Sequence, residues 1–145
     1  MGGPEWVAAG STNSPSTTIW PLRRTTDATV PDSAPGSITA VGGLTEAKRI
    51  ATLAHAQNLR VAPHVWGGAV GLATACHFIA ALPATPHTDH PPYPLMLEYD
   101  MSDNALRTKL LKAPLRLEAG HVLLPDGPGL GVELDRDAVE RYRIC

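Results

Sequence analysis

The architecture is read most directly from residues 59–82, LRVAPHVWGGAVGLATACHFIAAL. The first part is a short apolar run, which predicts a strand over residues 59–63. A glycine pair separates this run from residues 68–82, which are apolar almost all round and therefore predict a buried helix. A strand followed at once by a buried helix is the repeating unit of parallel α/β folds, so the stretch favours that class.

The same alternation continues on both sides. Upstream, apolar residues recur at i, i+3 and i+4 over residues 45–57, which predicts an amphipathic helix with Thr45 as its candidate N-cap. Downstream, a proline-rich loop over 83–94 leads into LMLEY, residues 95–99, a second short strand. The order helix, strand, helix, strand predicts parallel strands joined by crossover helices.

The C-terminal part changes character. One or two helical turns are predicted within residues 104–111, and a hairpin is predicted from 115–118 paired with 121–124. Asp135 is the candidate cap of a final short helix over 136–142. These pieces do not continue the α/β alternation.

Three segments are therefore expected. Residues 1–36 are rich in Pro, Gly, Ser and Thr without apolar periodicity, so they are predicted to be a disordered or unrelated low-complexity segment. Residues 37–114 form the α/β unit, and residues 115–145 form the C-terminal hairpin and helix. The abrupt change near Ser37 leads to the hypothesis of a truncated or frame-shifted gene product.

Composition and charge exclude several classes of partner. The 145 residues carry 12 basic and 14 acidic side chains, a formal net charge of −2, so there is no strongly basic field to attract nucleic acid. No apolar run approaches the length of a membrane span, and the N-terminus lacks a secretory-signal pattern, so no membrane partner is expected. Two cysteines cannot build a disulfide framework, which favours a reducing, cytoplasmic location.

Two ionisable residues fall at the predicted strand ends, where parallel α/β folds carry their reactive side chains. His64 closes the first strand, and an imidazole there can carry protons near neutral pH. Glu98 lies late in the second strand. From the residues alone a simpler interpretation stays open, with His64 as a loop residue and Glu98 as a solvated charge.

Other candidates are better explained by structure than by chemistry. Cys76 and His77 lie within an apolar helix, so a small buried hydrophobe and a helix-face histidine are expected. His87, Asp89 and His90 are metal-ligand residue types, but they stand between prolines without further ligands, which favours a solvated loop. The glycine pairs before the two helices favour tight turns, because no phosphate-loop pattern accompanies them.

Five motifs, in order and in register, resemble one known group of enzymes. They are VGGLTEA (41–47), VAPHVWG (61–67), LEYD (97–100), PDGPGLGV (125–132) and DAVERY (137–142). Over residues 38–145 they resemble the C-terminal part of the mandelate racemase/muconate lactonizing enzyme group of the enolase superfamily, which includes acid-sugar dehydratases. The resemblance implies the last strands and helices of a modified (β/α)-barrel, followed by a hairpin and helix that pack on a capping domain.

The resemblance also implies a chemistry, the removal of a proton next to a carboxylate with Mg²⁺ holding the resulting enediolate. His64 matches the general base or acid, Glu98 matches the residue that binds the substrate carboxylate, and Trp66 matches a pocket position beside the base. Ser37 stands where the group pairs its histidine with an aspartate. The acidic metal ligands of the group find no match in this chain.

The expected function is therefore Mg²⁺-dependent dehydration of a sugar acid, a small-molecule carboxylate, with racemisation or epimerisation as the sibling reaction. Whether this chain is itself an enzyme is left open, because the alternative is a truncated, inactive remnant acting as an interaction or assembly module. Exposed strand edges and apolar helix faces would then predict a homo-oligomer or aggregation. A flavodoxin-like binding module would explain the helix and strand order but not the five motifs.

Overall fold

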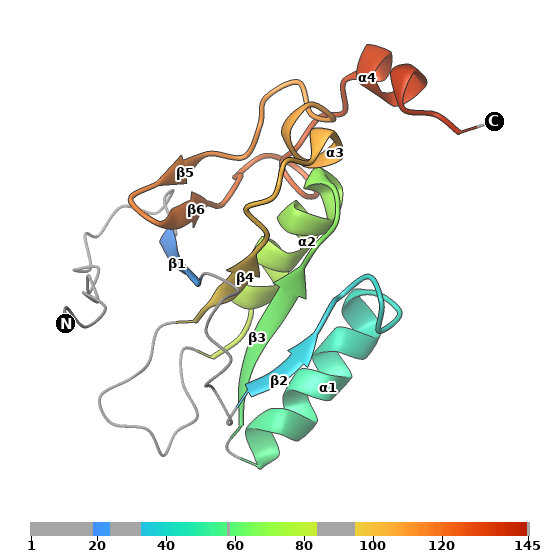
Figure 1. Ribbon diagram of the computed structural model, residues 1–145. Coiled ribbons are helices and arrows are strands. Elements are labelled where there is room, and N and C mark those ends of the chain that lie inside the picture. Colours follow the sequence, from blue (N-terminus) through green and yellow to red (C-terminus); the bar gives the residue numbers. More distant parts are fainter. Residues whose placement is uncertain (1–18, 24–32, 58, 84–94, 145) are drawn as a thin grey trace.

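Ten elements make up the part of the chain that the computed structural model describes, and they include the predicted helix–strand alternation as α1–β3–α2–β4 (Figure 1). That part comprises residues 19–23, 33–57, 59–83 and 95–144. The strands are β1 (Ile19–Arg23), β2 (Ser33–Gly36), β3 (Arg60–Val65), β4 (Leu97–Tyr99), β5 (Leu117–Glu118) and β6 (His121–Leu123). The helices are α1 (Leu44–Ala56), α2 (Ala69–Ala80), α3 (Ala105–Thr108) and α4 (Arg136–Arg141).

The six strands join one mixed sheet in the order β2-β3-β4-β1-β6-β5. The neighbours among β2, β3, β4 and β1 are parallel, which confirms the parallel arrangement predicted for the α/β unit. β6 is antiparallel to β1, and β5 is antiparallel to β6. Across β3 and β4, His64 is in register with Glu98, so the two strand-end residues are direct neighbours.

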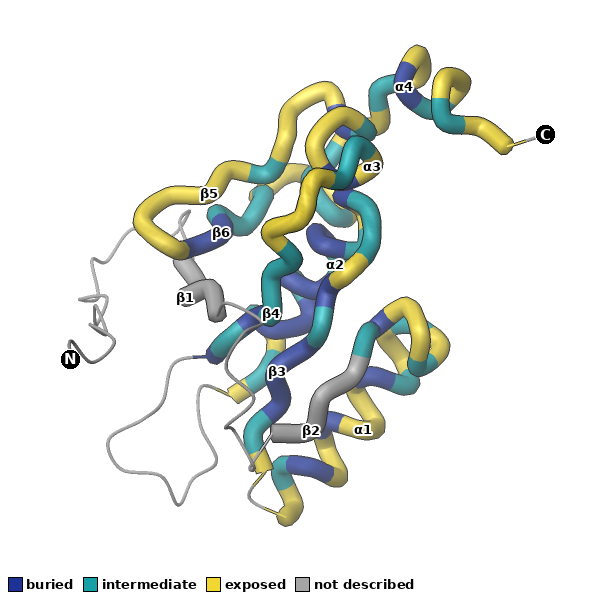
Figure 2. The backbone as a smooth tube through the Cα atoms, in the orientation of Figure 1, coloured by how far each residue is buried: buried dark blue, intermediate teal, exposed yellow. Residues whose placement is uncertain are grey.

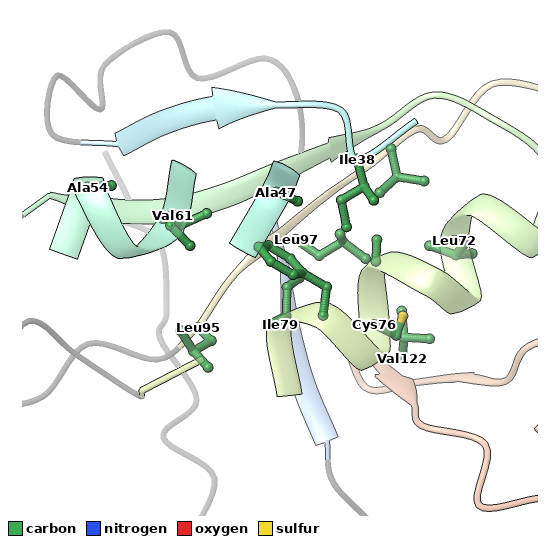
Figure 3. Close-up of a cluster of buried hydrophobic side chains, with 14 residues drawn as sticks. Ile38, Ala47, Ala54, Val61, Leu72, Cys76, Ile79, Leu95, Leu97 and Val122 are labelled. Carbon is green, nitrogen blue, oxygen red and sulfur yellow. The ribbon is translucent and has the colours of Figure 1, made fainter. Parts of the chain in front are cut away.

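The hydrophobic core lies between the sheet and the two long helices. Figure 3 shows side chains from five elements meeting there, among them Ala47, Ala54, Val61, Leu72, Cys76, Ile79, Leu97 and Val122. On β3 the core residues are Val61 and Val65. Because side chains alternate along a strand, Ala62 and His64 point to the opposite face of the sheet. The core therefore fixes which face the candidate base occupies.

The first helix begins one residue earlier than predicted and is capped differently. Thr45 is not the N-cap: α1 begins at Leu44, directly after Gly43, and has no side-chain cap. Gly42 and Gly43 have φ values of 102° and 93°, a region that only glycine adopts at low cost. The glycine pair is thus a tight turn, as predicted, and the geometry of this turn sets where the helix begins.

Strand β3 continues past Pro63, where the sequence predicted it to end. Pro63 is in register with Gly36 of β2, and the ladder with β4 begins only at His64. Proline has no N–H to donate, but no hydrogen bond to β4 is required from this position. His64 consequently lies inside the strand, paired on its β4 side, rather than in the loop that follows.

The C-terminal segment contains the predicted hairpin and helix. β5 and β6 are joined by Ala119 and Gly120, whose φ values of 49° and 78° suit a two-residue hairpin turn. Asp135 caps α4, because its Oδ1 accepts hydrogen bonds from the backbone N–H groups of Asp137 and Ala138. Figure 2 shows α4 largely exposed at one end of the structure. The packing of this segment on a capping domain stays a prediction.

The structure describes two strands within residues 1–36, the segment predicted to be disordered or unrelated low-complexity chain. β1 and β2 both lie inside it, and they pair with β4, β6 and β3. Ladder hydrogen bonds come from the backbone and need no apolar periodicity in the side chains, so composition could not locate these strands. The rest of the prediction, over residues 1–18 and 24–32, lies outside the described residues.

The cluster His87, Asp89 and His90 likewise lies outside the described residues. None of the described helices is both long and apolar enough for a transmembrane span.

Candidate active site

The imidazole of His64 and the carboxylate of Glu98 meet on the sheet face opposite the helices. His64 Nδ1 and Glu98 Oε2 are 2.9 Å apart, and 37% and 27% of the two side chains are exposed. An ionised carboxylate can only accept, so the Nδ1–H group of a neutral His64 donates this hydrogen bond. The bond selects the tautomer whose Nε2 lone pair is available to take a proton.

A small hollow beside His64 brings in the other residues that the sequence singled out. Its lining includes Ser37, Trp66 and Gly67 together with His64. Trp66 follows β3 directly and is 73% exposed. The structure thus places Trp66 beside the candidate base, at the carboxyl end of the parallel strands.

The carboxylate partner of His64 in the structure is not at the position that the resemblance implies. Ser37 follows β2, and its hydroxyl shares a 2.8 Å hydrogen bond with the hydroxyl of Thr39. A neutral hydroxyl cannot stabilise an imidazolium as a carboxylate does. Glu98, which the resemblance assigns to the substrate carboxylate, has one oxygen engaged by His64. In the structure Glu98, not residue 37, is therefore the carboxylate partner of the His64 imidazole.

Sequence reasoning missed a charged cluster that adjoins Glu98. Arg107 Nη1 donates to Asp100 Oδ2 at 2.7 Å, and 5% of the Arg107 side chain is exposed. The Ser102 hydroxyl and backbone N–H also donate to the Asp100 carboxylate. The Arg107 guanidinium lies 5.4 Å from the centre of the Tyr99 ring. The spacing of Asp100 and Ser102 is a turn signal that could have been read, whereas the contact with Arg107 arises only on folding.

This cluster has a defined charge state. Hydrogen bonds from the Ser102 side chain and backbone, with Arg107 adding to them, lower the pKa of Asp100 to about 2. Burial raises the pKa of the Tyr99 phenol, and the positive charge of Arg107 partly offsets that rise. Asp100 is consequently ionised at neutral pH while Tyr99 is protonated.

The two candidates on α2 are structural, as predicted. Cys76 is a buried free cysteine, and burial raises the pKa of its thiol to about 12. His77 Nε2 is 3.0 Å from the carbonyl oxygen of Leu130, which joins α2 to the C-terminal segment. Neither side chain is arranged for chemistry.

The residues that the structure describes do not fit the magnesium site that the resemblance implies. They contain no group of three or more His, Cys, Asp or Glu side chains that could hold a metal ion. Mg²⁺ takes oxygen ligands, commonly carboxylates and water, in near-octahedral geometry. Glu98 faces an imidazole instead of a second carboxylate, so the pair does not begin such a ligand set.

Comparison with known proteins gives this geometry a family context. A family model described as enolase C-terminal domain-like matches residues 11–138. The match begins at residue 11, so it includes most of the segment 1–36 that was expected to be disordered or unrelated to the family. A curated relative, the D-galactarolactone cycloisomerase of Agrobacterium fabrum, is 44% identical over 103 residues, which are 71% of this chain and 27% of the relative.

Solved structures agree with the sequence comparison. The 3,6-anhydro-D-galactonate cycloisomerase of Zobellia galactanivorans is 40% identical with a TM-score of 0.63, covering 77% of this chain and 29% of that one. A mandelate racemase/muconate lactonizing enzyme of Jannaschia sp. CCS1 is 30% identical with a TM-score of 0.61, covering 79% and 27%.

The chain therefore spans roughly a quarter of the length of the curated relatives it matches. Further relatives are dehydratases of sugar acids and a muconate cycloisomerase. The matches agree with the resemblance over residues 38–145 and with the α/β arrangement of the strands and helices. The chain belongs to the enolase C-terminal domain-like family, whose members similar to it are mandelate racemase/muconate lactonizing enzymes and sugar-acid dehydratases.

Proposed function

We propose that this chain carries an acid–base pair that moves a proton at the carbon next to a carboxylate, on a sugar acid or its lactone. The observation that carries this proposal is the 2.9 Å hydrogen bond between His64 Nδ1 and Glu98 Oε2. The relatives support the substrate class, because they include a cycloisomerase of a sugar lactone and dehydratases of sugar acids.

The pair performs two linked tasks. Nε2 of His64 takes the proton from carbon, and the ionised carboxylate of Glu98 stabilises the imidazolium that results. The same imidazolium then passes its proton to a departing hydroxyl, which gives dehydration. Return of the proton to the same face of the carbon only regenerates the substrate, so racemisation or epimerisation would need a second acid on the opposite face. Trp66 and Gly67 line the small hollow beside His64, at the end of β3 from which a substrate would approach the pair.

The charge left on the substrate needs a partner as well. The resemblance implies Mg²⁺ for this task, and a bound Mg²⁺ would supply Lewis-acid stabilisation of negative charge. The described residues hold no donor set for that ion. The role of His64 and Glu98 is therefore limited here to holding and moving the proton, with dehydration of a sugar acid favoured as the overall reaction.

The test measures proton exchange on candidate substrates. The full chain is incubated in D₂O with aldonic acids, aldaric acids and their lactones, with and without Mg²⁺, and deuterium at the carbon next to the carboxylate is followed by NMR. We expect exchange that is lost in His64→Asn and lowered about 10²-fold or more in Glu98→Gln. His55→Asn, the same replacement on α1, is the matched control and leaves exchange unchanged.

The outcomes separate the proposal from its alternative. Equal exchange in the unchanged protein and in His64→Asn would remove His64 from the chemistry. Absence of exchange with every substrate, at all Mg²⁺ concentrations, would support the alternative of a catalytically inactive chain that acts as an interaction or assembly module.

A further inference from the structure

Arg107 is a buried charged residue that the proposed proton transfer does not use. It lies in α3, a helix of four residues, and 5% of its side chain is exposed. Burying a guanidinium is costly unless its donors are satisfied, and replacing such a group usually disturbs whatever it is bonded to. The partners of Arg107 therefore show what it holds in place.

All of these partners lie within residues 99–102, immediately after Glu98. Nη1 donates to Asp100 Oδ2 at 2.7 Å, and Nη2 donates to the carbonyl oxygen of Ser102. The guanidinium also lies over the Tyr99 ring, 5.4 Å from its centre. Ser102 closes the turn on the other side, since its backbone N–H and hydroxyl donate to Asp100 at 2.9 and 2.7 Å.

Glu98 directly precedes this turn. β4 has three residues and makes two ladder pairs with each neighbour, so Glu98 is in register with His64 of β3 and with Arg23 of β1. Neither ladder has a pair beyond Tyr99, so the residues that follow are held by contacts other than sheet hydrogen bonds. The contacts of Arg107 with residues 99–102 supply such a restraint directly after Glu98.

The helix that carries Arg107 is itself tied to the segment after His64. Asn104 caps α3 by accepting a hydrogen bond from the Leu106 N–H, and its Nδ2 lies 3.5 Å from the carbonyl oxygen of Gly67. Leu106 packs so closely on Gly68 that a Cβ there would lie 3.3 Å from the Leu106 carbonyl oxygen. Figure 1 shows α3 beside the start of α2, where the chain leaves β3.

We propose that Arg107 is a positioning residue for the His64–Glu98 pair. By fixing residues 99–102, it holds the Glu98 carboxylate where it sets the tautomer of His64. The inference rests on the proposed function in one respect: proton transfer by His64 is what requires this tautomer. A guanidinium suits the task because its planar fork serves Asp100 and Ser102 at once while its face covers Tyr99, whereas a lysine can serve only one of these partners well.

The test reads the tautomer of His64 from the imidazole ¹⁵N signals of the full chain. Arg107→Met keeps the length of the side chain without its charge, and Arg107→Lys keeps the charge without the fork. We expect the Nδ1–H form in the unchanged protein, a mixture of tautomers in Arg107→Met, and an intermediate result in Arg107→Lys. Lys112→Met, which breaks the exposed pair with Glu133, is the matched control and leaves the tautomer unchanged.

A purely structural role gives a different pattern. Arg107→Met would then unfold at lower temperature while His64 kept the Nδ1–H form, and that result overturns the proposal. If Arg107→Met does not fold, Arg107→Lys and Asp100→Asn decide: an unchanged tautomer in both overturns it equally. Glu98→Leu, which removes the acceptor, separates the proposed function from the positioning role. An unchanged tautomer in Glu98→Leu refutes the His64–Glu98 bond and the proposed function together. A changed tautomer in Glu98→Leu without any change in the Arg107 variants refutes only the positioning role.

Discussion

At the scale of single residues, the choice of partner for His64 follows from strand register. Parallel pairing sets Glu98 level with His64, and alternation puts both on the face that the core leaves free. Ser37 comes directly after β2, at the corresponding end of the strand on the other side of β3. Ser37 and His64 line the same small hollow, and the imidazole bonds to the Glu98 carboxylate.

Ser37→Asp is expected to give His64 a second carboxylate partner. Because the introduced carboxylate could then orient the imidazole, Glu98→Gln should lose much less proton exchange in the Ser37→Asp background than in the unchanged protein. A hydrogen bond to a charged group contributes about 1.5–3 kcal/mol, so the difference between backgrounds should reach about 10-fold or more. A double-mutant cycle checks this coupling: proton exchange is measured in the unchanged protein, in Ser37→Asp, in Glu98→Gln and in the double variant.

Thr39→Asp is the control for that experiment, since it adds the same charge two residues further on. If Glu98→Gln lowers the proton-exchange rate equally in the Ser37→Asp protein and in the protein with Ser37, the side chain at position 37 does not reach the imidazole.

At the scale of elements, patterns with a strong period were predictable and backbone-only features were not. The buried helix α2 and the hairpin followed from apolar composition and turn residues. β1 and β2 were missed because parallel pairing with a neighbour, and not their own sequence, makes them strands. Pro63 was read as a strand end, although a proline is tolerated where the next ladder has not begun.

The candidate site divides in the same way. His64 and Glu98 could be found because strand ends in a parallel fold are known positions for reactive groups. Arg107 could not, because nothing in a four-residue helix indicates which side chain will be buried against Asp100. Contacts that close a loop depend on its three-dimensional path, which local periodicity does not encode.

The turn over residues 99–102 should make part of the stability depend on acid pH. The pKa of Asp100 in the folded protein is about 2, below its ordinary value of 3.8, mainly because Ser102 donates to the carboxylate. A lowered pKa contributes stability that is fully present above about pH 4 and is lost as pH falls toward 2. Urea titrations at about pH 5 and about pH 2.5 measure how much the free energy of unfolding falls between the two pH values. This fall should be smaller in Asp100→Asn than in the unchanged protein.

Ser102→Ala tests the assigned cause, because it removes the hydroxyl that donates to Asp100. In Ser102→Ala the fall in the free energy of unfolding between the two pH values should be smaller than in the unchanged protein and larger than in Asp100→Asn. An equal loss in all three proteins would mean that Asp100 does not govern acid stability.

At the scale of the whole molecule, one apolar cluster joins α1, β3, α2, β4 and β6. The sheet ends in β2 on one side and β5 on the other, so the predicted homo-oligomer or aggregate would form through edges of this kind. Leu97 shows how site and core are linked, because it is 1% exposed in the core while its neighbour Glu98 bonds to His64.

Leu97→Ala is expected to lower the free energy of unfolding by about 2–5 kcal/mol, through lost burial and the cavity left behind. Urea denaturation measures the change. Leu134→Ala removes the same atoms from a side chain that is 36% exposed, so it should cost far less and serves as the matched control. Similar losses in the two variants would show that Leu97 is not part of a close-packed core.

Cys76 offers a direct measure of how the same core opens. Burial raises the pKa of its thiol from 9.0 to about 12, which lowers the thiolate fraction at pH 8 about 1000-fold, and the surrounding side chains also block access. In Cys145→Ser, which leaves Cys76 as the single thiol, Ellman's reagent should react about 1000-fold or more slowly in native buffer than in urea. Because the reaction proceeds through opened molecules, Leu97→Ala should accelerate it in proportion to its loss of stability, whereas Leu134→Ala should not. Immediate labelling of Cys76 in native buffer would mean that α2 does not pack against the sheet as the structure places it.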